Sequence, residues 1–135
     1  MEAAEKGGYP HFMIKEIKEQ PEAIRTTVAP RVRAGLPCLE ECGITLEKLR
    51  EFKSISVVAC GTAMHAGLVG KYIIESIARV PVTVDIASEF RYRNPIVGEG
   101  DLVIIISQSG ETADSLAAMR LAKQKGATTL AIVNA

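Results

Sequence analysis

Hydrophobic positions in the last two thirds of the chain form short β-branched runs that alternate with stretches of helical spacing. The runs are apolar throughout, which is typical of strands that are buried on both faces of a parallel sheet. The predicted strands cover residues 55–59, 82–86, 102–106 and 128–133. The predicted helices cover residues 63–79, with apolar positions at Ala66, Val69, Ile73 and Ile77, and residues 113–125, with Gly126 just beyond the end. One helical turn is predicted around Glu89. This alternation predicts an α/β fold with three layers.

The first third of the chain is less regular. The spacing predicts a helix over residues 12–23, in which Pro21 marks a break or the first turn of another helix. Residues 29–44 are predicted to be loop and turn, and Thr45 is predicted to cap a short helix. We therefore expect a flexible lead over 1–11, a helical segment over 12–53 and an α/β core over 54–135.

The chain stops directly after the fourth predicted strand. We expect the α/β core to be incomplete and to lack its last strand and helix. An open sheet edge invites pairing with another chain, so a homodimer or higher oligomer is expected.

Composition narrows the classes of partner and location. The apolar content of 47% is ample for one packed core, and the 16 basic and 16 acidic residues balance. This balance gives no electrostatic reason to expect nucleic acid or an anionic membrane as a partner. The longest apolar run is too short to span a bilayer, and the N-terminus lacks the apolar stretch of a secretory signal. A cytoplasmic location is expected.

The cysteine pattern agrees with a reducing compartment. Three cysteines, Cys38, Cys42 and Cys60, form no disulfide-rich pattern. Cys38 and Cys42 could form half of a metal site, but no second Cys/His pair stands at ligand spacing. Free thiols and no metal site are therefore expected.

Two strand-to-helix turns are the candidates for chemistry. The first is Cys60-Gly61-Thr62, where Gly61 allows a positive φ and Thr62 is expected to cap the next helix. The exposed N–H groups at such a helix start favour an anion or a sugar hydroxyl. A turn of this kind is common, so its spacing alone leaves a structural role open.

The second turn, SQSGET at 107–112, has a higher density of polar groups. Its candidate binding residues are Ser107, Gln108, Ser109 and Thr112. No lysine or arginine occurs between residues 102 and 119, so a phosphate here would be held by neutral donors and the helix dipole. A structural reading, with Thr112 as helix cap and Ser109 in a turn, explains only part of this set.

Three other motifs are incomplete. Gly67 and Gly70 resemble part of a P-loop, but they fall inside a predicted helix and Tyr72 replaces the hydroxyl residue. The turn at Ser109 lacks the GxSxG pattern of a hydrolase elbow, and both histidines precede it. No GxGxxG follows the first strand, so the dinucleotide-binding motif is missing.

One pair of side chains is a further candidate. Cys60 and His65 could form a thiolate pair, although a cysteine at the end of a buried strand more often packs in the core.

Four segments together resemble one known family: CGTAMHAG at 60–67, ASEFRYR at 87–93, SQSGETADSL at 107–116 and KEIKEQPEAIRTT at 15–27. They are similar to the isomerase half of glutamine–fructose-6-phosphate aminotransferase, which is built from SIS (sugar isomerase) domains with a flavodoxin-like or Rossmann-like parallel sheet. The resemblance implies that Ser107, Gln108, Ser109 and Thr112 hold a sugar 6-phosphate and that Cys60, Gly61 and Thr62 line the sugar pocket. It implies fructose 6-phosphate or glucosamine 6-phosphate as ligand and no cofactor. Ala63 departs from the pattern, since a serine hydroxyl is expected there.

The resemblance also bears on catalysis. The carboxylate, lysine and histidine of the family's isomerase reside outside the segments matched here, so no catalytic residue is assigned. We expect this chain to bind hexose 6-phosphate without turning it over alone. A standalone SIS module of a sensor or regulator is the alternative, and a generic nucleotide binder is a weaker one. ASEFRYR and KEIKEQPEAI favour the aminotransferase.

Overall fold

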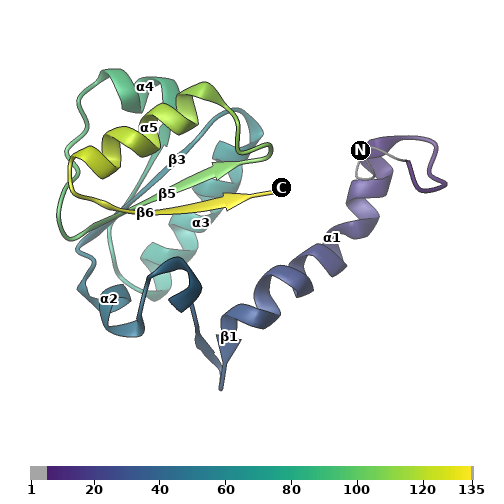
Figure 1. The fold of residues 1–135 in the computed structure, drawn as a ribbon, viewed down its shortest axis with the longest axis horizontal. Coiled ribbons are helices and arrows are strands. Elements are labelled where there is room, and N and C mark those ends of the chain that lie inside the picture. The colour runs from purple at the N-terminus through teal and green to yellow at the C-terminus, as the bar shows by residue number, and fades with distance from the viewer. Residues whose placement is uncertain (1–5, 135) are drawn as a thin grey trace. The chain divides into compact units, whose positions relative to one another are not determined.

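The computed structural model describes residues 6–134 of the chain. These residues divide into two compact units, one that ends at Leu46 and one that begins at Glu47 (Figure 1). None of the helices within the described residues combines the length and the apolar character needed to cross a membrane.

The first unit consists of one long helix and several short elements. These are α1 (Phe12–Val28), the 3₁₀ turns η2 (Ala29–Arg31) and η3 (Glu40–Cys42), and the strands β1 (Val32–Arg33) and β2 (Leu36–Pro37). Helix α1 is longer than predicted and runs through Pro21 without ending there. A proline removes one backbone donor, and the helix retains its other hydrogen bonds on both sides. The predicted break at Pro21 is therefore wrong.

A small hairpin lies in the stretch predicted as loop and turn. Strands β1 and β2 pair antiparallel, and the two residues between them both have positive φ, 51° at Ala34 and 75° at Gly35. This left-handed pair gives the tight turn that a two-residue hairpin connection requires. Strands of two residues are too short to leave a periodic pattern in the sequence, so the hairpin was not predicted.

The second unit is the α/β core. Its elements are α2 (Leu46–Glu51), β3 (Ser54–Ala59), α3 (Thr62–Ile77), β4 (Val82–Ile86), α4 (Ala87–Tyr92), β5 (Asp101–Ser107), α5 (Ala113–Gln124) and β6 (Thr128–Val133). The four strands form a parallel sheet in the order β4-β3-β5-β6. The strands, the two main helices and the turn at Glu89 are confirmed to within two residues.

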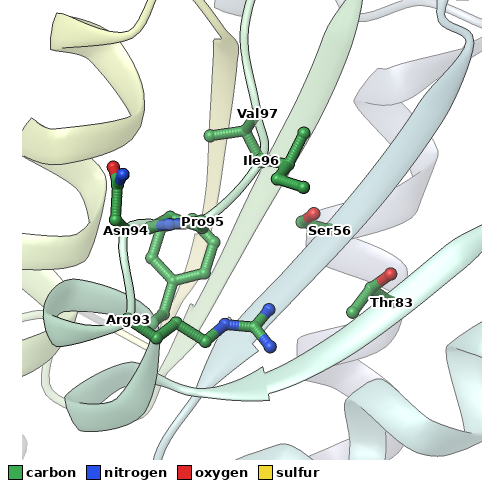
Figure 2. Close-up of a pocket in the computed structure, with 8 residues that line it drawn as sticks. Ser56, Thr83, Arg93, Asn94, Pro95, Ile96 and Val97 are labelled. Atoms are coloured by element: carbon green, nitrogen blue, oxygen red, sulfur yellow. The ribbon is translucent and has the colours of Figure 1, made fainter.

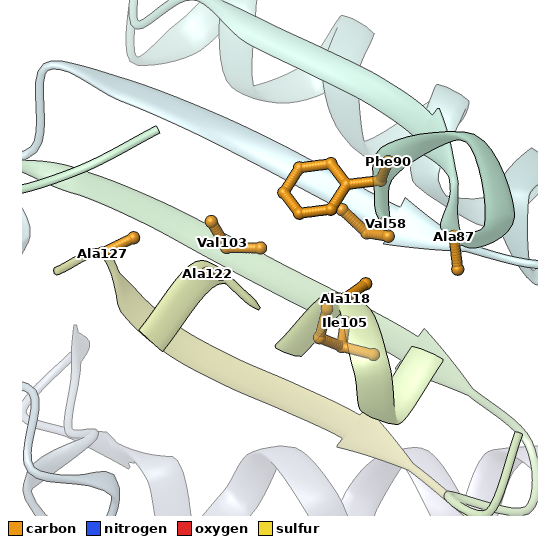
Figure 3. Close-up of a cluster of buried hydrophobic side chains, with 8 residues drawn as sticks. All are labelled: Val58, Ala87, Phe90, Val103, Ile105, Ala118, Ala122 and Ala127. Carbon is orange, nitrogen blue, oxygen red and sulfur yellow. The ribbon is translucent and has the colours of Figure 1, made fainter. Parts of the chain in front are cut away.

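Helices cover both faces of the sheet, which confirms the three-layer α/β architecture. Helices α4 and α5 lie on one face and α3 lies on the other (Figure 1). The buried cluster on the α4/α5 face combines alanines and Phe90 from the helical side with Val58, Val103 and Ile105 of the strands (Figure 3). Its members are Val58, Ala87, Phe90, Val103, Ile105, Ala118, Ala122 and Ala127. The alanines let α5 approach the sheet closely.

Helix α3 packs on the sheet through a glycine. Gly67 is buried, and a Cβ placed on it would lie 2.8 Å from Cγ1 of Val57 in β3. The apolar positions that revealed this helix, including Val69, Ile73 and Ile77, are instead exposed. The helix prediction is confirmed, but its apolar stripe is not the face that meets the sheet. The residue without a side chain permits the closest approach, and hydropathy does not mark that residue.

Side chains of α3 also hold the start of β4. The Val82 N–H donates to Glu75 Oε1 at 3.0 Å, and Lys71 Nζ donates to the Val82 carbonyl at 2.7 Å. Lys71 and Glu75 form an ion pair at 3.4 Å. The hydrogen bond from Val82, aided by Lys71, lowers the pKa of Glu75 below its ordinary value. This pair of side chains therefore holds the end of α3 against the start of β4, the strand that comes next in the chain.

Candidate functional site

The two turns singled out in the sequence meet at one end of the sheet. Strands β3 and β5 are neighbours in parallel register, with Ala59 opposite Ile106, so their carboxyl ends lie side by side. A cavity of about 190 Å³ lies there. Its lining residues are Cys60, Thr62, Ala63, Ile106, Ser107, Gln108, Ser109, Thr112 and Ser115. Every candidate residue except Gly61 lines the cavity, at the edge where open α/β sheets bind ligands.

Gly61 shapes the first turn. It has a φ of 57° and a ψ of −136° and occupies the N-cap position of α3. The helix therefore begins at Thr62, and the prediction that Thr62 caps it is wrong. This backbone conformation suits a glycine, so Gly61 takes the cap position and Thr62 becomes the first residue of the helix. Gly61 has no side chain with which to cap α3, and the Met64 N–H donates to the Gly61 carbonyl at 3.2 Å. The N–H groups of Thr62 and Ala63, which line the cavity, therefore lack a side-chain cap from Gly61.

Serine hydroxyls order the second turn. The Gly110 N–H donates to Ser107 Oγ at 3.1 Å, and the Glu111 N–H donates to Ser109 Oγ at 3.2 Å. Gly110 has a φ of 71°, which an L side chain rarely adopts. Each serine hydroxyl accepts one hydrogen bond and still carries its own hydrogen to donate. The turn thus presents hydroxyl donors whose oxygens are already held in place.

Thr112 stands at the N-cap position of α5, as the structural reading predicted. Its side chain, however, makes no capping hydrogen bond to any residue that the structure describes. The hydroxyl and the first N–H groups of α5 are therefore not used by the usual cap. The Ser109 hydroxyl accepts a hydrogen bond within the turn, so a purely structural role accounts for part of its function. A structural role does not account for the Thr112 hydroxyl.

Helix dipoles supply the positive potential at the cavity. The N-terminal residues of α3 (Thr62, Ala63) and of α5 (Thr112 at its cap, Ser115) all line it, and none of its lining residues carries a charge. The N-terminus of each helix carries a partial positive charge, so two such ends favour an anion without a cationic side chain.

One charged pair lies in the first turn of α5. Arg91 Nη1 donates to Asp114 Oδ1 at 2.9 Å, and this hydrogen bond is the main reason why the pKa of Arg91 is raised. Arg91 comes from α4, so the sheet and helices bring together residues that are far apart in the chain. Arg91 offsets the negative charge of Asp114 near the N-terminus of α5. The local sequence gave no sign of this pairing, because it contains no lysine or arginine.

Ser115 was not among the predicted site residues. Its residue is 3% exposed, and its Oγ finds no hydrogen-bond partner within the described part of the chain. Ser115 lies three positions after Thr112 on a helix, which places both on one side of α5. This three-residue spacing was the sequence feature that could have identified Ser115 as a site residue.

The Cys60–His65 pair gains no support. Cys60 is half-buried and packs against the buried cluster, whereas His65 is exposed. Cys38, Cys42 and Cys60 are free thiols. No group of metal-binding side chains gathers anywhere in residues 6–134.

A second, larger cavity of about 470 Å³ lies toward the opposite ends of the strands (Figure 2). Ser56 and Thr83 border it near the starts of β3 and β4, together with the loop that follows α4. Arg93 in this loop is paired with Asp85. Burial raises the pKa of Asp85, and Arg93 opposes that rise. This cavity is the larger of the two. The smaller cavity, however, has the N-termini of α3 and α5 and the hydroxyls of Thr112 and Ser115 in its lining, so we take the smaller cavity as the candidate site.

Comparison with known families identifies the α/β core. The family model described as SIS domain matches residues 48–135, which include the whole sheet and both turns. The chain belongs to the SIS domain family. Two curated relatives carry the name glutamine–fructose-6-phosphate aminotransferase [isomerizing]. The protein of Clostridium acetobutylicum is 60% identical over 98% of this chain, and that of Caldanaerobacter subterraneus is 61% identical over 99% of it. This chain spans 22% of the length of each.

Two solved structures share the fold of this chain. The C-terminal domain of glucosamine-fructose-6-phosphate aminotransferase from Francisella tularensis is 44% identical, with a TM-score of 0.82 over 98% of this chain and 37% of that one. Tagatose-6-phosphate ketose/aldose isomerase from Escherichia coli shares the fold at 17% identity, with a TM-score of 0.66. That match covers 92% of this chain and 34% of the isomerase.

Proposed function

We propose that this SIS domain binds a hexose 6-phosphate as part of a glutamine–fructose-6-phosphate aminotransferase. The observation that carries the proposal is the small cavity at which two uncapped helix N-termini meet a set of hydroxyls, with no charged residue in its lining. Such a site suits a phosphate monoester, which needs several donors and gains from helix dipoles. The names of the relatives support fructose 6-phosphate as a ligand. Glucosamine 6-phosphate is the second ligand that we propose, as the resemblance implies.

The two turns divide the ligand between them in this proposal. Ser107, Gln108, Ser109 and Thr112 hold the phosphate, because their loop leads into the N-terminus of α5. The turn from Cys60 to Thr62 faces the sugar, with the N–H groups at the start of α3 available to its hydroxyls. The serine hydroxyls, already positioned by backbone N–H groups, lose little freedom when a ligand binds.

We propose that this chain binds a hexose 6-phosphate but does not convert it. Aldose–ketose isomerisation moves a proton between neighbouring carbons and needs a positioned base. The described lining residues include no aspartate, glutamate, histidine or lysine. We therefore propose that this chain forms no glucosamine 6-phosphate from fructose 6-phosphate and ammonia by itself. Product detected above a no-protein control would contradict this.

A standalone phosphosugar-binding regulator is the second candidate function. Both candidates require the same cavity, so the geometry does not separate them. The identity of 60% to aminotransferases over nearly the whole chain favours the enzyme. A coding sequence that continues into a second SIS unit would support the aminotransferase, and one that joins a DNA-binding domain would support the regulator.

Calorimetric titration with fructose 6-phosphate and glucosamine 6-phosphate tests the binding proposal. Ser109→Ala removes one donor to a charged ligand and should weaken binding about tenfold. Ser76→Ala is the matched control, because Ser76 is exposed and its hydroxyl donates to the Ile73 carbonyl. Unphosphorylated fructose should bind far more weakly. If neither sugar phosphate produces heat or protects the fold from thermal unfolding, the proposal fails.

We also propose self-association and a cytosolic location. Within residues 6–134, β6 pairs with β5 and with no other strand, so its second edge is open, and Ile132 and Val133 on it are exposed. Open edges and apolar side chains both favour association with another chain. Sedimentation that gives a monomer mass at high concentration would contradict the proposed self-association.

The proposed cytosolic location rests on the cysteines. The three free thiols fit a reducing compartment.

A further inference from the structure

Ser115 breaks the composition of the α5 face that packs on the sheet. The face continues from Ser115 through Ala118 to Ala122, and all three residues are buried. Alanine suits this face because it lets the helix approach the strands. A serine at the first of these positions adds a hydroxyl that packing does not need.

That hydroxyl is buried without a partner. Ser115 is 3% exposed, and its Oγ bonds to no group in residues 6–134. The neighbouring Asp114 is engaged with Arg91, so it does not serve Ser115. A buried hydroxyl that lacks a partner is unfavourable, and such groups in native proteins usually meet a ligand, an ion or a water.

The position of Ser115 indicates which ligand atom it meets. It lines the same cavity as Ser107, Ser109 and Thr112, and it lies in the first turn of α5. The positive end of that helix favours the negatively charged part of a ligand. The sugar turn at Cys60 belongs to the other helix. A hydroxyl within the first turn of α5 is therefore suited to a phosphate oxygen.

We propose that Ser115 is a further phosphate-binding residue, whose hydroxyl donates to a phosphate oxygen. This inference rests on the proposed function, because it assumes a hexose 6-phosphate in that cavity. Ser115 adds a hydroxyl at a site where Ala63, which also lines it, supplies none. The ligand completes the hydrogen bonding of a group that the protein alone leaves unsatisfied.

Ser115→Ala provides the test, because it removes the hydroxyl and restores the alanine face. We expect about tenfold weaker binding of fructose 6-phosphate and of inorganic phosphate, by the same factor, in calorimetry. We also expect an unchanged or raised melting temperature without ligand, since no hydrogen bond of the free protein is lost. Ser115→Thr keeps the hydroxyl and should bind more tightly than Ser115→Ala.

The outcomes separate this inference from the function on which it rests. If the unaltered chain binds no hexose phosphate, the proposed function fails and the inference fails with it. If the unaltered chain binds and Ser115→Ala binds equally well, only the inference fails. A lowered melting temperature of the free variant would assign Ser115 a structural role instead. Weaker binding of fructose 6-phosphate with unchanged binding of inorganic phosphate would overturn the assignment to phosphate.

Discussion

Two glycines in the same helix should respond in opposite ways to alanine. Gly67 and Gly70 both lie within α3, and their spacing made them resemble part of a P-loop. A Cβ on Gly67 would lie 2.8 Å from Cγ1 of Val57, whereas a Cβ on Gly70 would meet no atom within 4 Å. The perturbation is one methyl group at each position. Only the contact with the sheet differs.

The magnitudes follow from these contacts. Alanine in place of glycine inside a helix gains about 1 kcal/mol through propensity. At Gly70 nothing opposes this gain, so Gly70→Ala should stabilise by about 1 kcal/mol. At Gly67 the new methyl group overpacks a site bordered by Val57, which is 3% exposed and has a stiff β-branched side chain. Overpacking of this kind costs about 1–3 kcal/mol, so Gly67→Ala should destabilise by about 1 kcal/mol on balance.

Urea denaturation of the two variants measures both changes. The difference of about 2 kcal/mol between them should appear as a lower midpoint for Gly67→Ala and a higher one for Gly70→Ala, with similar slopes. Combining Gly67→Ala with Val57→Ala should recover part of the loss, because the added methyl then has room. If Gly67→Ala stabilises as much as Gly70→Ala, α3 does not approach β3 as closely as the structure has it.

Three further predictions concern the cavity, the turn beside it and the contact between α3 and β4. Ala63→Ser should bind fructose 6-phosphate about fivefold more tightly in calorimetry, since it adds one hydroxyl to the cavity; weaker binding would show that this wall must stay apolar. Gly110→Ala should lower stability by about 1 kcal/mol, because alanine disfavours the positive φ there, and an unchanged urea midpoint would contradict this. Glu75→Gln should melt at a lower temperature than the unaltered chain at neutral pH. The pKa of Glu75 is lowered in the folded protein, so its contribution is present above the ordinary value of 4.5 and is lost as the pH falls through the folded value. The two melting curves should therefore converge in acid, and a difference that persists there would refute the role of the carboxylate.

The sequence predicted most of the α/β core but misjudged parts of the first unit. Long apolar runs and helical spacing placed the strands and main helices, because these patterns repeat over many residues. The β1–β2 hairpin left no such pattern, since each strand has two residues. Helix α1 continued through Pro21, which a rule based on local propensity treats as a stop.

The candidate site was also predicted only in part. Both turns were found because glycine and hydroxyl residues cluster directly after buried strands. Ser115 was missed, because its role depends on burial without a partner, a property that only packing creates. Arg91 was missed because its partner Asp114 is distant in the sequence.

The sequence by itself determined the order of the elements, the absence of lysine and arginine from the second turn and the resemblance to SIS domains. These features reside in residue types and in their spacing along the chain. The tertiary structure decided which of two similar glycines meets the sheet, which hydroxyls order the turn, and which hydroxyl is left without a partner. Those answers depend on contacts between β3, β5 and the helices, which form only when distant segments pack together.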